Sequence, residues 1–463
     1  MKTFKLAILL ALVLVLVTIL PVSAQLGDTD ISTFTIQNIS DTTATVSVTF
    51  VGTDGTEYQP ADLGGGTTNP FSLAPAAAKQ IVVSQISSTD LPSGSYSVVI
   101  SSDVQVVAQA GLAGTGSIRF TGAYTGFSAG ATTLYIPTIA YNSFGWYSLI
   151  SVQNLGDGPA DVTVTLFCTT GTAAGSTATL TQLDIPANAS KTWALKSVVP
   201  TGLTASDTCD GSATVTSDQP VVAVNNQNRP DLGSTNSFEG AVDGSDTVYV
   251  GGLSKNYFGW ISALTIQALG TSIDTNVTID YGGTEWTNDT CHLTDAAPSC
   301  KLIIPNAVET DGRYAATITS DDGTKLLAVV GSTNNGTPPR SLSNAVNGAG
   351  GGNNTVAIPN VAKNYFDFKT AITCQNVGGV ATAVNFSYSG YEANAYNSAV
   401  LNPGESLQVV LTSESFLPDG YNGGATLTAV AAGGSIYCFA GNTKTSNLAG
   451  DWTSAFNGFG YDQ

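Results

Sequence analysis

The sequence contains very little histidine and few positively charged residues. Its 463 residues include one histidine, and Lys and Arg total 15 against 34 Asp and Glu. One histidine cannot supply a catalytic base to several similar domains, and no P-loop or H-E-x-x-H pattern occurs. We therefore expect a protein that is not an enzyme. The formal net charge of −19 disfavours nucleic acid and anionic lipid as partners.

Long apolar runs are also scarce, and the one that occurs lies at the N-terminus. Lys2 and Lys5 precede an apolar run over 7–20, and Val22-Ser23-Ala24 forms a small-residue cleavage signal. This pattern predicts a signal peptide over 1–24. The alternative is an uncleaved membrane anchor, although the run is short for a membrane span. Localisation is expected to be secreted or cell-surface, without a membrane span in the mature chain.

What the chain does contain is a repeat. The phrase "KNYFGWISALTIQALG" has relatives elsewhere, and its glutamine recurs at Gln37, Gln153, Gln267 and Gln375. Turn signals such as "LPSG" and "LPDG" and closing junctions such as "AVDG" and "AVNG" recur in the same order. The predicted organisation is a signal peptide over 1–24 and four units: unit 1 over 25–128, unit 2 over 129–244, unit 3 over 245–350 and unit 4 over 351–463.

Each unit shows the alternation of apolar and polar residues that half-buried strands require. Examples are "TATVSVTFV" (43–51) and "ADVTVTLFC" (160–168), with turn residues every eight to twelve positions. About seven short strands in roughly 110 residues is the size of an immunoglobulin-like sandwich. The predicted fold class is therefore all-β, a tandem array of four Ig-like β-sandwich domains after a signal peptide.

Units 2 to 4 begin with an apolar leading strand, such as "TLYIPTIAYN" (133–142), which unit 1 is expected to lack. One explanation is that end repeats cap an array. The other is that unit 1 leaves a sheet edge open, which a strand of another subunit completes. In unit 3 the usual proline-led strand is missing, and "KLIIP" (301–305) is expected to replace it.

Six cysteines fall two per unit in units 2 to 4. In a secreted chain an even number indicates disulfides, and pairing within units is the simplest of the fifteen connectivities. A metal site is the alternative, but there is no C-x-x-C and the single histidine has no partner histidine. The expected disulfide cysteines are Cys168 with Cys209, Cys291 with Cys300, and Cys374 with Cys438.

Acceptor patterns for N-glycosylation are frequent, as expected in part by chance in a chain rich in Asn, Thr and Ser. They begin at Asn38, Asn188, Asn276, Asn288, Asn335, Asn353 and Asn385. Calcium is the one metal considered, because carboxylates lie near junctions and tight turns at Asp243, Asp246, Asp321 and Asp322. No complete calcium-loop pattern accompanies them, so solvated turns are the favoured interpretation, with no cofactor.

The aromatic residues of the repeated phrase have two interpretations. They are expected to seal the seam between the leading strand and its sandwich, since they recur at one place in each unit. Alternatively, they line a sugar-binding surface. The residues concerned are Phe144, Trp146, Tyr257, Trp260, Tyr365 and Phe368.

The phrases "YNSFGWYSLISVQNLGDGPADVTVTLF", "LPDG" and "GSATVTSDQPVVAVNN" resemble the repeated β-sandwich domains of secreted bacterial cell-surface proteins. The resemblance covers nearly all of 27–458 and carries no catalytic residues. It implies an uncharacterised surface or matrix protein. The one-strand offset between the two ends and the polar, low-charge surface lead us to expect an extracellular structural protein, a cell-surface, sheath or filament subunit that self-associates head to tail. The alternative is an adhesin or carbohydrate-binding protein whose partners are surface glycans.

Overall fold

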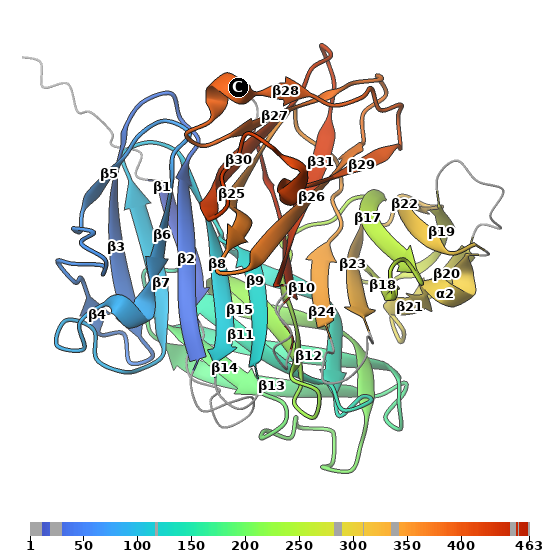
Figure 1. Cartoon of the computed structure of the whole chain (residues 1–463). Coiled ribbons are helices and arrows are strands. Elements are labelled where there is room, and N and C mark those ends of the chain that lie inside the picture. The colour runs from blue at the N-terminus through green and yellow to red at the C-terminus, as the bar shows by residue number, and fades with distance from the viewer. Residues whose placement is uncertain are drawn as a thin grey trace, which may run out of the picture.

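A computed structural model describes residues 12–18, 30–115, 119–281, 289–308, 310–334, 342–444, 451 and 453–461. Over these ranges the chain is all-β, as predicted, and its one α-helix is the single turn α2 (Ile304–Ala307). In Figure 1 the units occupy four quadrants, with unit 1 blue at the left, unit 2 green below, unit 3 yellow at the right and unit 4 orange to red above.

Unit 3 shows the common sandwich most plainly. One sheet has the order β17-β22-β19-β20 and the other the order β21-β18-β23-β24, and residues of both sheets share one apolar core. Its strands are β17 (Thr247–Lys255), β18 (Trp260–Ala268), β19 (Asp274–Asp280), β20 (Asp289–Thr294), β21 (Ser299–Ile303), β22 (Gly312–Ser320), β23 (Leu326–Asn334) and β24 (Leu342–Asn347). Strand β21 contains most of the "KLIIP" segment and pairs with β18, as the proline-led strands of the other units do.

Units 1 and 2 repeat this arrangement with small variations. Unit 1 consists of β2 (Asp30–Asn38), β3 (Ala44–Gly52), β4 (Glu57–Tyr58), β5 (Phe71–Leu73), β6 (Ala78–Val82), the 3-10 turn η1 (Val83–Gln85), β7 (Tyr96–Ser102), β8 (Val106–Thr115) and β9 (Arg119–Thr125). Unit 2 consists of β10 (Ala131–Tyr141), β11 (Tyr147–Asn154), β12 (Ala160–Thr170), β13 (Thr177–Ile185), β14 (Ser190–Ala194), β15 (Cys209–Arg229) and β16 (Ser234–Glu239). The long β15 passes through both sheets and joins them.

Unit 4 also joins its sheets, here through the pairing of β25 with β26. Its elements are β25 (Thr355–Tyr365), β26 (Phe368–Asn376), β27 (Val384–Tyr388), η2 (Glu392–Asn394), β28 (Tyr396–Asn397), β29 (Ser406–Val410), η3 (Leu411–Ser413), β30 (Tyr421–Ala429), β31 (Ile436–Lys444), β32 (Thr453–Asn457) and β33 (Phe459–Tyr461). Three disulfides each join two cysteines of one unit: Cys168–Cys209, Cys291–Cys300 and Cys374–Cys438.

The repeated Gln-Asn pair has a structural role in three units. The buried Asn154 side chain donates to the carbonyl oxygens of Gly158 (2.7 Å) and Ile185 (2.9 Å), and it accepts the N–H of Gly156 (2.8 Å). Asn38 and Asn376 make equivalent bonds in units 1 and 4. The asparagine therefore fixes the turn that leads into the next strand, which explains why the phrase is repeated.

The four units form a closed ring. Each apolar core includes residues of the next unit: Leu149 of unit 2 in the unit 1 core, Val329 of unit 3 in the unit 2 core, and Phe439 of unit 4 in the unit 3 core. The unit 4 core includes Ala123 of unit 1, so the last unit packs on the first. The sequence left open whether the array is straight or bent, and the packing bends it until its ends meet.

One strand of each unit lines the centre of the ring. Strand β9 contacts β16, β16 contacts β24, β24 contacts β32, and β32 contacts β9. Polar bonds cross these seams: the buried Asp451 carboxylate accepts the N–H groups of Thr235 and Ser343, each at 3.0 Å, and so connects units 4, 2 and 3. Glu239 accepts the N–H of Thr125 and the amide of Asn347 (2.8 Å), which connects units 2, 1 and 3.

Unit 1 does have a strand in the leading position, which corrects the expectation that it lacks one. Strand β1 (Leu12–Thr18) pairs with β7, in the place that β10, β17 and β25 take beside β15, β22 and β30. It lies within the predicted signal peptide. Gln37 lies sixteen positions after Pro21, as Gln153 lies sixteen positions after Pro137, so the repeat extends into that peptide. The described part of the chain contains no helix long and apolar enough to cross a membrane.

Candidate functional site

Each of units 2 to 4 presents a phenylalanine at the tip of a tight turn. In unit 2 the turn 143–146 joins β10 to β11, with the Trp146 N–H donating to the Ser143 carbonyl at 2.9 Å. Its two central residues, Phe144 and Gly145, have φ values of 51° and 82°. Positive φ at both positions defines a type I′ hairpin turn. The equivalent phenylalanines are Phe258 (φ 48°) and Phe366 (φ 46°).

These phenylalanines occupy a conformation that suits them poorly. The first central position of a type I′ turn favours Asn, Asp or Gly, and a bulky residue with positive φ costs of the order of 1–3 kcal/mol. Burial of the rings does not offset this cost, because the exposed fractions of Phe144, Phe258 and Phe366 are 86%, 83% and 71%. Among the described residues, the rings of Phe258 and Phe366 each contact only the neighbouring tyrosine ring, edge-on. Their high exposure makes the three tips candidates for contact with a partner molecule.

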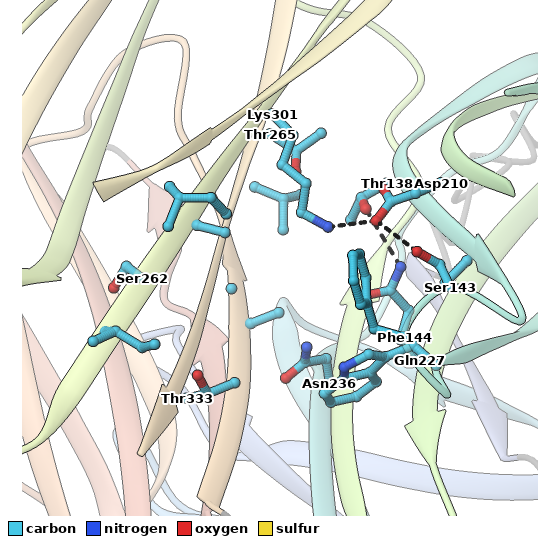
Figure 2. A pocket seen from close by; sticks show the side chains of 18 residues that line it. Thr138, Ser143, Phe144, Asp210, Gln227, Asn236, Ser262, Thr265, Lys301 and Thr333 are labelled. Atoms are coloured by element: carbon cyan, nitrogen blue, oxygen red, sulfur yellow. Dashed lines mark hydrogen bonds and ion pairs between the residues drawn. The ribbon is translucent and has the colours of Figure 1, made fainter. Parts of the chain in front are cut away.

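The tip of unit 2 borders a cleft of about 220 Å³ between units 2 and 3. Phe144 and Trp146 form one wall, and the opposite wall is the outer face of the β21-β18-β23-β24 sheet, including Ile261 and Val329. Figure 2 shows polar side chains from both units directed into this space. They are Thr138, Ser143, Asp210, Gln227 and Asn236 from unit 2, and Thr265, Lys301 and Thr333 from unit 3. Ser262 also lines the cleft, but its hydroxyl is hydrogen-bonded to Ser332 Oγ of the same unit at 2.7 Å.

An ion pair crosses this cleft. Lys301 Nζ of unit 3 lies 2.8 Å from Asp210 Oδ2 of unit 2, and Ser143 Oγ donates to the same oxygen at 3.3 Å (Figure 2). The Asp210 side chain is largely buried and the Lys301 side chain is partly exposed, and the two opposite charges offset each other. What remains open to a ligand is an aromatic rim with neutral hydrogen-bonding groups.

A second cleft, of about 370 Å³, repeats this arrangement between units 3 and 4. Tyr257, Phe258 and Trp260 form its aromatic rim. The opposite wall comes from the β29-β26-β31-β32 face of unit 4 and includes Gln408 and Phe439. Planar apolar rims beside amide and hydroxyl groups suit a ligand with apolar faces and polar edges, as sugars have.

The aromatic residues of the repeated phrase do not share one role. The seam-sealing role predicted for Phe144 is wrong, because its ring projects into solvent. Tyr365 packs edge-on against Phe366 with 4.6 Å between ring centroids, and Lys444 Nζ lies 5.6 Å from the Phe368 ring centroid. Phe258 and Phe366 were not predicted as candidates. The available sequence signal is the Gly or Asp that follows each of them, since these residue types favour the positive φ of a type I′ turn.

The structure separates the predicted glycosylation sites. At Asn38 the structure contradicts the prediction of a glycosylation site. The Asn38 amide is buried and hydrogen-bonded within the turn, so no glycan can be attached there without unfolding the turn. Asn276 is exposed, and Asn188, Asn353 and Asn385 are half-buried. Asn288 and Asn335 lie outside the described residues.

The aspartates considered for calcium serve as partners for protein groups. Asp243 is paired with Lys325 at 2.7 Å, and the Lys325 ammonium lowers its pKa. The Asn276 amide lowers the pKa of Asp321, and the Thr324 N–H lowers that of Asp322. Asp246 accepts the Ser320 N–H through its backbone oxygen. Among the described residues, no three His, Cys, Asp or Glu side chains come together as metal ligands.

Two further features have the residue types of catalytic groups. Residues 126–130 read G-F-S-A-G, the pattern of a nucleophile elbow, but an elbow requires a strand-to-helix turn and this segment connects β9 to β10. The histidine, His292, lies on β20 with Nε2 2.8 Å from Asp274 Oδ1, and both side chains are exposed. Ser128 and His292 belong to different units, and neither lines the two clefts.

Comparison with known proteins adds no family. No protein-family model, curated protein or solved structure matches this chain.

Proposed function

We propose that this protein is an extracellular carbohydrate-binding protein of four Ig-like sandwiches, which binds surface glycans in the clefts between its units. The observation that carries the proposal is the set of exposed phenylalanines held in strained turns beside clefts with hydrogen-bonding groups. Three disulfides are compatible with an extracellular location.

The closed ring helps to decide between two candidate functions, glycan binding and head-to-tail assembly. Strand β2 near the start of the mature chain lies between β6 and β8, and β32 near its end lies between β31 and β9. Both ends are therefore engaged within the molecule, which supports binding over end-to-end joining. The tip recurs in three units, and several linked binding sites on one molecule raise the affinity for a multivalent glycan.

The test is a glycan array probed with the secreted protein and with the triple variant F144N/F258N/F366N. Asparagine is favoured at the first central position of a type I′ turn, so each change should stabilise the fold by about 0.5–1 kcal/mol. We expect glycan binding to fall at least about tenfold while the melting temperature rises. If the variant is more stable but binds glycans less tightly, the loss of binding cannot be attributed to unfolding.

The matched control is L183N/V400N, which removes two other exposed apolar side chains that line neither cleft. This control should retain full binding. Undiminished binding by the triple phenylalanine variant would exclude the tips as the recognition surface.

Assembly remains a second candidate, and one observation favours it. The edge of β7 that faces away from β3 is covered by β1, which lies in the predicted signal peptide. Cleavage after Ala24 would expose this edge, and a strand of a second copy would then complete it. The structural-subunit proposal therefore rests on the β7 edge.

A further inference from the structure

A guanidinium without a carboxylate partner lies in the cleft between units 3 and 4. Arg313, on β22, is half-buried, and its Nη2 donates to Thr373 Oγ1 of unit 4 at 2.9 Å. It takes part in none of the ion pairs found among the described residues. Burial lowers its pKa, yet an arginine side chain keeps its charge in proteins. Within the described part of the chain, this positive charge is held by a hydrogen bond to a neutral hydroxyl and by no carboxylate.

The equivalent positions of units 2 and 4 do not carry a positively charged residue. Sheet register places Arg313 opposite Ser254, Asp210 opposite Ala140 and Asn422 opposite Ala362, at equivalent points of the repeat. Each faces the next unit's proline-led strand or its replacement. Asp210 meets Lys301 there, and Asn422 Nδ2 meets Gln80 Oε1 at 3.3 Å. Arg313 instead meets a wall that provides Thr373 and Gln408, both neutral.

The backbone beside Arg313 is adapted to leave room for it. Unit 3 has Gly251-Gly252 where unit 2 has Pro137-Thr138. A Cβ on Gly252 would lie 3.0 Å from the Phe439 ring and 3.1 Å from Arg313 Nη2, and its φ of +76° also disfavours other residues. Space, charge and the aromatic rim thus come together in this one cleft.

We propose that Arg313 binds the carboxylate of an acidic sugar whose ring lies against the aromatic rim of this cleft. This proposal rests on the carbohydrate-binding function proposed above and assigns the class of sugar. The guanidinium offers N–H donors in the planar fork that matches a carboxylate. Because the chain carries a net charge of −19, it repels extended polyanions. The ligand is accordingly a glycan with one acidic residue, bound at its end.

The experiment compares glucuronic acid with glucose, its uncharged counterpart, in NMR titrations of the secreted protein. The main variant is R313N, because unit 4 carries asparagine at this position within the same fold. We expect wild type to bind glucuronate at least about tenfold more tightly than glucose, and R313N to bind the two equally. The control is K196M, which removes an exposed positive charge that lines neither cleft. It should leave the preference intact.

The possible failures can be told apart. If R313N retains the full preference for glucuronate, the assignment of Arg313 is overturned while carbohydrate binding stands. If wild type binds neither sugar, acetate serves as a carboxylate without a sugar ring. Acetate-induced shifts that vanish in R313N would then support the anion site and reject the carbohydrate function. Absence of any acetate effect would overturn both proposals.

Discussion

At the scale of single residues, the repeated asparagine and the repeated phenylalanine show opposite relations to stability. Asn154 is buried, and its amide satisfies three backbone groups that would otherwise lack partners. Phe144 is exposed and strains its turn. Both belong to one phrase of the sequence, where recurrence alone does not distinguish a folding role from a binding role.

Replacing Asn154 with alanine should lower the free energy of unfolding by about 2–4 kcal/mol, because buried backbone groups lose their partners. Chemical denaturation with disulfides intact measures the change. Asp157→Ala, an exposed change in the same turn, should stay within about 0.5 kcal/mol of wild type. Unit 3, which has Ala268 at this position, shows that the sandwich forms without the amide. A loss below 1 kcal/mol would therefore mean that neighbouring groups replace it.

At the scale of elements, the leading strand decides how each unit meets its surroundings. In units 2 to 4 it covers an edge of its own sheet and contacts the second strand of the next unit, as in β10 with β18 and β17 with β26. Strand β1 makes the corresponding contact with β11. A cleaved signal peptide would leave this one of the four positions vacant, with unpaired backbone groups along β7.

Protein that begins at Gln25 should therefore self-associate through the β7 edge, and S101K should weaken this association about tenfold, since lysine on an exposed edge opposes strand addition. Sedimentation velocity across a concentration series measures the effect. The matched control is T319K at the equivalent position of β22, whose edge β17 already covers. Monomeric behaviour of the unmodified Gln25 protein at all concentrations would argue against strand completion.

At the scale of the whole molecule, closure places carboxyl groups in the centre of the ring. Burial raises the pKa of Asp451 well above its usual value, against the opposing effect of the N–H groups of Thr235, Ser343 and Thr453. Burial likewise raises the pKa of Glu239. The folded state thus binds protons more tightly than the unfolded state at these two groups, and stability is linked to pH.

The raised pKa values determine whether stability rises or falls with pH. A carboxyl group with a raised pKa contributes most to stability below its unfolded pKa of about 4, and that contribution is lost as pH rises through the folded pKa. We expect the free energy of unfolding to fall as the pH rises from about 4 towards the raised pKa values of the folded state. D451N should make this slope shallower by up to about 1.4 kcal/mol per pH unit, which is the contribution of one proton. Glu57→Gln on the exposed β4 is the control, and an unchanged slope in D451N would contradict this explanation.

Much of the architecture could be predicted because it depends on local pattern. Alternation specified the strands, as in β19, whose residues alternate between exposed and buried along its length. Recurrence of Gln37, Gln153, Gln267 and Gln375 specified four units, and "KLIIP" was placed in its strand despite the altered sequence. Period-2 patterns carry this information because a strand buries every second side chain.

The sequence by itself therefore determined that the chain is all-β and where many of its strands lie, and it predicted that these strands belong to four related units. Only the tertiary structure decided that unit 4 packs on unit 1 and that Asn38 is inaccessible. It also decided that Asp210 pairs with Lys301 in one cleft, whereas none of the described acidic residues pairs with Arg313 in the other. The alternation of residue types along a strand reflects which face of the strand is buried. Which residues of different units come into contact depends instead on the angles at which whole units pack. Those angles result from many contacts between side chains that are far apart in the sequence, so no local sequence pattern predicts them.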